Sequence, residues 1–329
     1  MDIIGDTALV ALEFPDWDRR VYAKCEFQNP SGSIKDRFAS QVICDAVQRG
    51  EVSEETRILE CSSGNTGIAL AMVGAAMGLG VTIVISAKAS LERRKLLHRL
   101  GAEIILLPEA SNYQDGIDLC RSMAEKDARL FLPEQFENPV NTEDHRLGTG
   151  KEIISQLTVP VDAFVSGYGT GGTLSGCSLA IKERYPNARI IALEPVEHTQ
   201  SPELNECCFN IEGVAGCGFR PKLLEKAAVD NTVQIPTEEA FQMTQRLHRD
   251  FGLLVGTSSG ANVLGALMTA RELGRDAAIV TILCDRAERY FSTPLFRDTE
   301  NDPELLVNQI IQKDDKKSES FEHEDPASV

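Results

Sequence analysis

The sequence predicts an α/β fold, built on mostly parallel sheets with helices on both faces. Three observations predict it. Short apolar runs alternate along the chain with longer segments that have a helical pattern. The runs are apolar throughout instead of alternating with polar residues, which is typical of strands buried on both faces. Glycine-rich turns follow two of these runs, at strand ends where ligands collect in parallel sheets.

The predicted elements follow one another along the whole chain, whose 329 residues suffice for two domains or one large unit. The predicted strands are Arg57–Glu60, Val81–Ile85, Ile104–Leu107, Arg129–Leu132, Ala163–Ser166, Ile190–Glu194 and Ala278–Leu283. The predicted helices between them are Asn65–Met77, Leu91–Leu100, Gln114–Lys126, Thr173–Arg184 and Glu238–Asp250. We expect a last helix at Pro303–Gln312 and a disordered polar tail over residues 314–329.

A lysine stands at the start of a further predicted helix. Gly32 permits a tight turn, and Ser33 is expected to be the helix N-cap. Lys35 then falls in the first helical turn, where the helix dipole and burial lower the pKa of an ammonium group. Such a lysine is suited to forming a Schiff base. A surface lysine paired with Asp36 or Glu26 is the alternative.

The turn Ser62-Ser-Gly-Asn-Thr-Gly67 links a predicted strand to a small, apolar helix. The helix start exposes backbone N–H groups, and Ser62, Ser63 and Thr66 add hydroxyl groups beside them. Both kinds of donor form charge-assisted hydrogen bonds with an anion. This turn therefore predicts a site for a carboxylate.

A second turn, Gly167-Tyr-Gly-Thr-Gly-Gly-Thr173, also runs from a strand into a helix. Its N–H groups and the hydroxyls of Thr170 and Thr173 predict a cradle for phosphate. The glycine spacing also satisfies G-x-G-x-x-G, and Glu194 ends the next strand at a distance suited to a ribose hydroxyl. A dinucleotide-binding enzyme is therefore an alternative, although it would leave Lys35 and the first turn without a role.

Composition excludes several classes of protein. The formal net charge of −17 argues against a surface for nucleic acid or anionic membrane. No apolar run reaches the roughly 20 residues of a membrane-spanning helix, and the N-terminus lacks the pattern of a secretory signal. The nine cysteines form no C-x-x-C pair, and we expect reduced thiols in the cytoplasm. No histidine or cysteine spacing typical of a metal site occurs.

The turns, in their order along the chain, resemble the cysteine synthase family of fold type II pyridoxal phosphate enzymes. The resemblance runs from Ile4-Gly-Asp-Thr-Ala-Leu-Val10 to Glu288-Arg-Tyr-Phe-Ser-Thr-Pro-Leu-Phe296, and it includes Gln135-Phe-Glu-Asn-Pro139 and Gly256-Thr-Ser-Ser-Gly260. It implies two domains, each with a mostly parallel twisted sheet flanked by helices. We expect a larger domain from residues 1–38 and 144–313 and a smaller, mobile domain from 39–143.

The resemblance also implies roles for individual residues. Lys35 is similar to the lysine that forms the Schiff base with pyridoxal 5'-phosphate, and Asn65 to the asparagine that bonds the cofactor's ring oxygen. Ser258 is similar to the hydroxyl residue that faces the pyridine nitrogen. The phosphate loop corresponds to Gly169, Thr170, Gly171, Gly172 and Thr173. The substrate carboxylate set corresponds to Ser62, Ser63, Thr66 and Gln135.

The implied activity is that of a transferase in cysteine biosynthesis. It would replace the β-substituent of O-acetylserine or O-phosphoserine through an aminoacrylate intermediate, with sulfide as the nucleophile and L-cysteine as the product. Lys35 would remove the Cα proton as general base. A neutral serine at the pyridine nitrogen makes the ring a weaker electron sink, which suits elimination. The resemblance further implies a homodimer, and a serine acetyltransferase C-terminal peptide as a partner, with or without retained catalysis.

Some positions depart from the commonest pattern of the family. Arg286 is similar to an arginine of relatives that make 2,3-diaminopropionate with an amino-acid nucleophile, so that activity is the second expectation. Arg220 is expected near the mouth of the site and is included among the substrate-binding residues. These cations would bind a phosphate or a second carboxylate. The other departures are Ser62, Lys151, Tyr168, Cys217 and Cys284.

Overall fold

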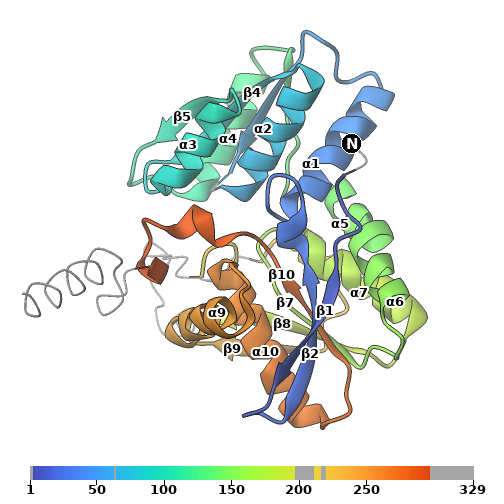
Figure 1. Ribbon diagram of the computed structural model, residues 1–329. Helices are drawn as coiled ribbons and strands as arrows, with labels where there is room; N and C mark the ends of the chain where they lie inside the picture. Colours follow the sequence, from blue (N-terminus) through green and yellow to red (C-terminus); the bar gives the residue numbers. More distant parts are fainter. Residues whose placement is uncertain (1–2, 63, 197–210, 216–219, 297–329) are drawn as a thin grey trace, which may run out of the picture.

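The computed structural model describes residues 3–62, 64–196, 211–215 and 220–296. Its strands form two separate sheets (Figure 1). The expected helix at 303–312, the expected tail at 314–329, Ser63 and Cys217 lie outside the described residues. Among the described helices, none is both long and apolar enough to cross a membrane. The α/β class and the arrangement in two sheets agree with the prediction.

The larger sheet has six strands in the order β1-β2-β10-β7-β8-β9. All of its neighbouring pairs are parallel except β1 and β2, which form an antiparallel hairpin at one edge. The strands are β1 (Leu9–Phe14), β2 (Arg19–Cys25), β7 (Ala163–Gly167), β8 (Arg189–Pro195), β9 (Asn231–Ile235) and β10 (Ile279–Leu283). The sequence did not predict β1, β2 or β9, and it predicted the other three within one residue at each end.

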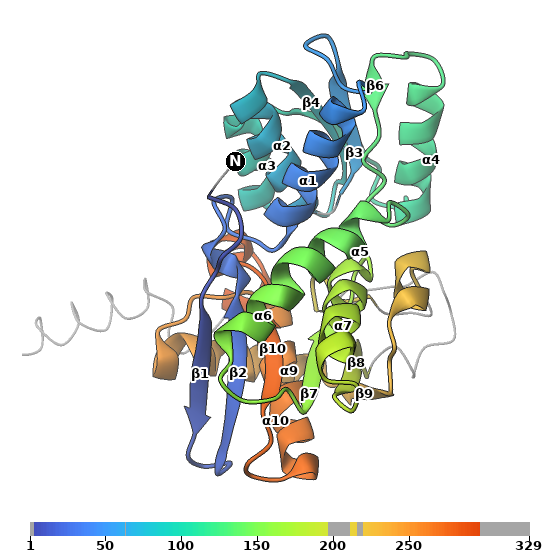
Figure 2. The same cartoon turned by 90° about the vertical axis from the view of Figure 1, so that its right-hand side faces the viewer.

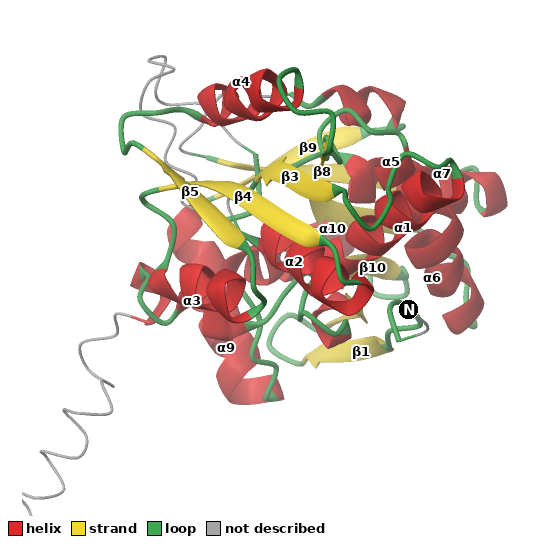
Figure 3. Cartoon of the chain, turned by 90° about the horizontal axis from the view of Figure 1, so that it is seen from above, coloured by secondary structure: helices red, strands yellow, loops and turns green. Residues whose placement is uncertain are grey.

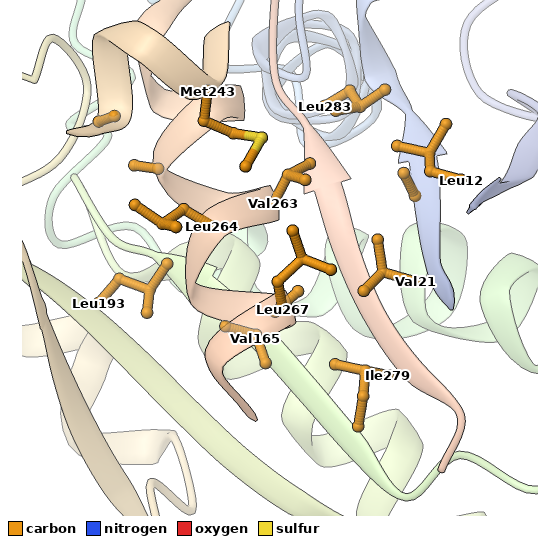
Figure 4. Close-up of a cluster of buried hydrophobic side chains, with 14 of the residues drawn as sticks. Leu12, Val21, Val165, Leu193, Met243, Val263, Leu264, Leu267, Ile279 and Leu283 are labelled. Carbon is orange, nitrogen blue, oxygen red and sulfur yellow. The ribbon is translucent and has the colours of Figure 1, made fainter. Parts of the chain in front are cut away.

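Helices cover both faces of this sheet, as continuously apolar strands require. One face carries α9 (Thr237–Phe251) and α10 (Thr257–Leu273), whose Leu264 and Leu267 pack with Val165 and Ile279 (Figure 4). The other face carries α7 (Gly172–Arg184) and the run α5 (Val140–His145), η2 (Arg146–Gly150) and α6 (Lys151–Gln156) (Figure 2). These two cores fix the ends of β7 and β10, from which two of the site segments begin.

The smaller sheet is parallel throughout, with the order β5-β4-β3-β6. Figure 3 shows α2 and α3 on one of its faces and α4 on the other. Its elements are β3 (Arg57–Cys61), α2 (Asn65–Met77), β4 (Gly80–Ser86), α3 (Leu91–Arg99), β5 (Glu103–Leu107), α4 (Tyr113–Ala124) and β6 (Leu130–Phe131). The helix α1 (Lys35–Gln48) leaves the hairpin of the larger sheet and packs on α2. The predicted elements of this half are confirmed, α2 to the residue.

Short 3-10 segments complete the described chain. They are η1 (Glu26–Gln28), η3 (Lys222–Lys226), η4 (Ala287–Tyr290) and η5 (Pro294–Phe296). Both η1 and η4 lie next to the start of α1. Glu26 of η1 pairs with Arg37, and Ile34 N donates to Cys284 O at 2.9 Å just before η4. Segments from the two ends of the chain therefore meet at Lys35.

Candidate active site

Lys35 is the first residue of α1, and the turn before it is held from the far end of the chain. Arg289 Nη1 donates to Gly32 O at 3.1 Å. Gly32 has a φ of 87°, and a Cβ there would lie 2.9 Å from atoms of Arg286 and Arg289. Only glycine fits this backbone and this space. The prediction of Ser33 as N-cap is wrong: Ile34 precedes the helix, and Ser33 Oγ accepts from Lys35 N at 3.3 Å, which tightens the turn.

The carboxylates nearest in sequence to Lys35 are occupied by other donors. Asp36 accepts from Ser31 N at 2.6 Å. Glu26 pairs with Arg37, whose Nε lies 2.7 Å from Glu26 Oε2. Among the described residues, no ion-pair partner of Lys35 is found, so the alternative of a lysine paired with Asp36 or Glu26 is wrong.

Burial lowers the pKa of Lys35, although its electrostatic interactions with Cys284, Asp285 and Glu26 act in the opposite direction. A lowered pKa leaves a larger fraction of the amine unprotonated near neutral pH. An unprotonated amine is the form that attacks a carbonyl carbon or accepts a proton. The surroundings of Lys35 therefore give it the properties that both steps need.

The carboxylate turn, residues 62–67, lies between β3 and α2 and is closed by its own hydroxyl. Ser62 Oγ accepts from Gly67 N at 2.9 Å and from Gly64 N at 3.2 Å. Thr66 Oγ1 donates to Gln135 Oε1 at 2.6 Å. Ser62, Thr66 and Gln135, predicted from segments far apart in sequence, are thus brought together and buried.

Gln135 is itself fixed, since its Nε2 donates to Cys61 O and to the Tyr113 hydroxyl, both at 3.0 Å. Its side-chain oxygen accepts from Thr66, so the orientation of the amide is set from two sides. The side chain of Tyr113 was not predicted to take part. It reaches the turn from the start of α4, and its hydroxyl donates to Cys61 O at 2.5 Å.

Asn65 begins α2 and faces a carboxylate that the sequence did not single out. Asn65 Nδ2 donates to Asp285 Oδ2 at 2.5 Å, and the Tyr290 hydroxyl donates to the same oxygen at 2.6 Å. Asn65 Oδ1 and Asp285 Oδ1 are both buried without a hydrogen-bond partner. Buried polar atoms without partners are uncommon and point to a ligand that would complete the site.

The phosphate turn, residues 167–173, joins β7 to α7 and has glycine where no Cβ fits. Gly171 has a φ of 86°, and a Cβ there would lie 2.8 Å from Leu224 N. A Cβ at Gly169 would lie 2.8 Å from Gly213 O. The first N–H groups of a helix have no helical acceptors. The turn therefore presents backbone donors at the start of α7, as predicted for an anion cradle.

The hydroxyls of the phosphate turn are held by α5, which the sequence left without a role. Asn141 Nδ2 donates to Thr170 Oγ1 at 3.0 Å. His145 contacts Thr173 Oγ1 through Nε2 at 3.1 Å and Thr149 Oγ1 through Nδ1 at 2.9 Å. Burial, and then the charges of Arg37 and Lys35, hold the pKa of His145 well below its ordinary value. His145 is therefore a neutral ring that orients Thr173.

Ser258 is the second residue of α10 and is buried. Cys284, at the end of β10, lies beside it, and Asn262 Nδ2 donates to Cys284 Sγ at 3.4 Å. Burial, and then the charge of Asp285, raise the pKa of Cys284 to about 12, so the thiol stays neutral. A Cβ at Gly256 would lie 2.2 Å from Asp285 Oδ1, which explains the glycine that precedes α10.

Four residues that were singled out lie elsewhere or have other partners. The Tyr168 hydroxyl donates to Glu194 Oε1 at 2.6 Å, so this carboxylate is not free for a ribose. Arg286 does not reach into the site as a free cation, because its Nε donates to Phe27 O at 3.0 Å behind the lysine turn. Lys151 is exposed at the start of α6, and Arg220 is exposed next to Tyr168.

The residues present fit a phosphorylated aldehyde that carries a ring. One amine of lowered pKa, one cradle of helical N–H groups and two orphaned buried oxygens converge from both sheets. A second anion turn, with Ser62, Thr66 and Gln135, lies beside Asn65. A dinucleotide would use the cradle alone.

Comparison with known proteins agrees with this geometry. Residues 1–285 match the family described as pyridoxal-phosphate dependent enzyme. A cysteine synthase of Staphylococcus aureus is 40% identical over 300 residues, covering 89% of this chain and 95% of that protein. The O-acetylserine dependent cystathionine beta-synthase of Helicobacter pylori superposes with a TM-score of 0.84 at 35% identity, covering 90% of this chain and 97% of that one. An O-ureido-L-serine synthase also gives 0.84 at 35% identity, with 93% and 98% covered.

Proposed function

Since the chain belongs to the pyridoxal-phosphate dependent enzyme family, we propose that it makes L-cysteine from an O-activated L-serine and sulfide. It is a pyridoxal phosphate enzyme of the β-replacement type. The observation that carries the specific proposal is Lys35. This amine has a lowered pKa and no ion-pair partner among the described residues. It interacts electrostatically with Asp285, the partner of Asn65, and with His145, the partner of Thr173.

The cofactor would be held at several points along the site. Lys35 would bind its aldehyde carbon, and residues 169–173 its phosphate. Asn65 would bond the ring oxygen with its Nδ2 as the donor, the group that now donates to Asp285 Oδ2. Ser258 would face the ring nitrogen. When bound, the cofactor supplies an electron sink for the bonds at Cα of the substrate.

The chain's own groups account for the remaining steps. Ser62, Thr66 and Gln135 would bind the substrate carboxylate and fix Cα near Lys35 Nζ. Ser63 belongs to the same proposed set. Lys35 would take the Cα proton as general base, and loss of the leaving group from Cβ would follow. The neutral Cys284 and Ser258 place no negative charge near the ring nitrogen, which favours elimination over transamination.

The donor is O-acetylserine or O-phosphoserine, and Arg220 is the proposed contact to the outer end of the donor or nucleophile. It is exposed and lies close enough to Tyr168 for its charge to affect that phenol. A second candidate function is β-replacement with an amino-acid nucleophile. It is supported by structural neighbours named for products other than cysteine.

A substrate matrix tests the proposal. Purified protein loaded with pyridoxal phosphate would be incubated with O-acetylserine or O-phosphoserine, each with sulfide, thiosulfate or an amino acid. We expect cysteine formation with sulfide to be the fastest combination. Product formed only with an amino-acid nucleophile would replace the first function by the second, and no product from any donor would contradict both.

The assembly and the compartment belong to the same proposal. We expect a cytoplasmic homodimer, which light scattering after gel filtration would measure. The six cysteines in the described part of the chain are unpaired, which supports a reducing compartment. Movement of residues 39–143 against the rest, with closure over the substrate, is supported by the division into two sheets. Binding of a serine acetyltransferase C-terminal peptide would be measured by competition with the donor.

A further inference from the structure

Arg93 is a buried cation of α3 that the proposed chemistry leaves without a role. Only 6% of the residue is exposed, and its Nε is buried without a hydrogen-bond partner. Its guanidinium forms an ion pair with Glu212. The guanidinium carbon also lies 5.1 Å from the centroid of the Tyr290 ring, within the range of a cation–π contact. Glu212 and Tyr290 lie outside the four-stranded sheet to which α3 belongs.

The aliphatic part of Arg93 packs directly on the carboxylate turn. A Cβ built at Gly64 would lie 2.6 Å from Arg93 Cδ and 2.6 Å from Nε. The contact with Arg93 therefore leaves no room for a Cβ at this position.

The partners of Arg93 lead to the other parts of the site. Tyr290 donates to Asp285, which holds Asn65. Glu212 belongs to residues 211–215, and this segment lies on the phosphate turn, because Ala215 N donates to Tyr168 O at 2.6 Å. One side chain thus contacts the carboxylate turn and is linked to the segments that border the ring and phosphate positions.

Neighbouring contacts hold the same end of α3. Ser90 Oγ donates to Arg289 O at 3.0 Å, and Ser292 Oγ donates to Glu92 Oε2 at 2.7 Å. Both contacts join α3 to the segment around η4. The Ser292 contact is exposed and the Ser90 contact is partly buried, whereas the Arg93 side chain is buried. Of the three side chains at this end of α3, Ser90, Glu92 and Arg93, it is Arg93 that packs on the carboxylate turn.

We propose that Arg93 is a positioning residue for substrate binding. It packs against Gly64 and is held by Glu212 and Tyr290. These contacts would keep the carboxylate turn next to the segments that follow β8 and β10 of the six-stranded sheet. The N–H groups of the turn that do not donate to Ser62 Oγ would then face the substrate carboxylate without having to be ordered when it binds. The proposal rests on the carboxylate role of residues 62–67.

The first test compares Arg93→Ala with Arg99→Ala, which removes an exposed arginine from the same helix. We expect Arg93→Ala to raise KM for the serine donor ten- to hundredfold while kcat changes less than threefold. Arg99→Ala should change neither. A readout independent of activity is hydrogen exchange of residues 61–70 in the cofactor-free protein, which should be faster in Arg93→Ala only.

Glu212→Gln covers the case in which Arg93→Ala does not fold, because it removes one charge at a partly exposed partner. We expect a three- to tenfold rise in KM. A double-mutant cycle then tests the contact itself: Gly64→Ala should raise KM less when position 93 is already alanine.

Equal KM and equal exchange in Arg93→Ala and Arg99→Ala, or an effect on kcat alone, would overturn the proposal. If Arg93→Ala does not fold, an unchanged KM in Glu212→Gln would overturn it. Failure of the proposed function is distinguishable, because wild-type protein would then turn over no donor while the exchange measurement still reports on the turn.

Discussion

Lys35 combines a tight turn, burial and the absence of a carboxylate partner among the described residues. Replacing Lys35 with alanine should abolish β-replacement and the visible absorption band of protein incubated with pyridoxal phosphate, since the amine that forms the bond is lost. Absorbance spectra and cysteine formation would measure both. Lys126→Ala, at an exposed lysine of the same chain, is the control and should keep the band. A normal band in Lys35→Ala would show that another amine binds the cofactor.

Glu60 shows how a residue behind the site makes stability depend on pH. It is buried beneath the carboxylate turn, and Gln135 N donates to Glu60 Oε2 at 3.3 Å. Burial raises the pKa of Glu60 from 4.5 to about 8. The folded state therefore holds this proton more tightly than the unfolded state. The resulting stabilisation is complete below pH 4.5 and is lost as pH rises to about 8.

Replacing Glu60 with glutamine removes this titration. Glu60→Gln should match the wild type at pH 4.5 and exceed its free energy of unfolding by about 3 to 5 kcal/mol above pH 8. Urea unfolding of the cofactor-free protein at several pH values would measure the difference. Glu125→Gln, at an exposed glutamate, should show no such trend. A difference that is the same at every pH would contradict the shifted pKa.

At the scale of elements, the sequence predicted best what depends on local pattern. Continuous apolar runs predicted all four strands of the smaller sheet and β7, β8 and β10 of the larger one, and α2 was predicted to the residue. The hairpin β1–β2 was missed because it lies at an edge, where strands are only partly apolar. The start of α10 was interpreted as a glycine turn, and the helix itself was not predicted, since its small residues give no amphipathic pattern.

The residues of the site divide in the same way, into those that a local motif predicts and those whose role depends on a contact distant in sequence. Lys35, Asn65 and the glycine turns lie in local motifs and could be named from sequence. Asp285 and His145 could not, because their roles arise from contacts across 220 and 28 positions, which no local spacing encodes. Arg286 was expected near the entrance from its similarity to an arginine of the 2,3-diaminopropionate-type relatives, and its hydrogen bond to Phe27 O is a contact across 259 positions that this similarity does not encode.

The start of α7 depends on a contact with α5, and this can be tested by changing one hydroxyl. Thr173→Val keeps the shape of the side chain but removes the group that contacts His145 Nε2, and it should weaken binding of pyridoxal phosphate about tenfold. Thr173→Ser keeps the hydroxyl and should bind like the wild type. Spectral titration of cofactor-free protein measures both. Equal affinities would show that the hydroxyl contributes nothing to the cradle.

The whole molecule is joined behind the site by a buried ion network. Arg37 of α1 pairs with Glu26 of η1 and with Glu152 of α6, each at 2.7 Å. Lys24 of β2 reaches the same Glu152 at 2.6 Å. The network connects the helix that begins with Lys35 to the hairpin and to the run that carries His145. Its integrity therefore fixes both the amine and the phosphate turn relative to the larger sheet.

Breaking this network should cost far more than breaking a surface pair. Arg37→Ala leaves Glu26 buried and unpaired, and we expect a loss of about 3 to 5 kcal/mol of unfolding free energy. Arg49→Ala, at the opposite end of the same helix, is the matched control, because its partner Glu51 is exposed, and it should lose far less. Urea unfolding at neutral pH measures both. Similar losses in the two variants would contradict the role of burial.

The same network sets the response to acid. Burial alone would raise the pKa of Glu152, but the hydrogen bonds and charges of Arg37 and Lys24 hold it at about 2. The stabilisation from this carboxylate is therefore complete above its ordinary pKa of 4.5 and is lost as pH falls towards 2. Without Arg37, the pKa of Glu152 rises, so the acid unfolding midpoint of Arg37→Ala should lie at higher pH than that of the wild type. Circular dichroism along a pH titration measures the midpoints, and an unchanged midpoint would mean that Lys24 alone holds the charge.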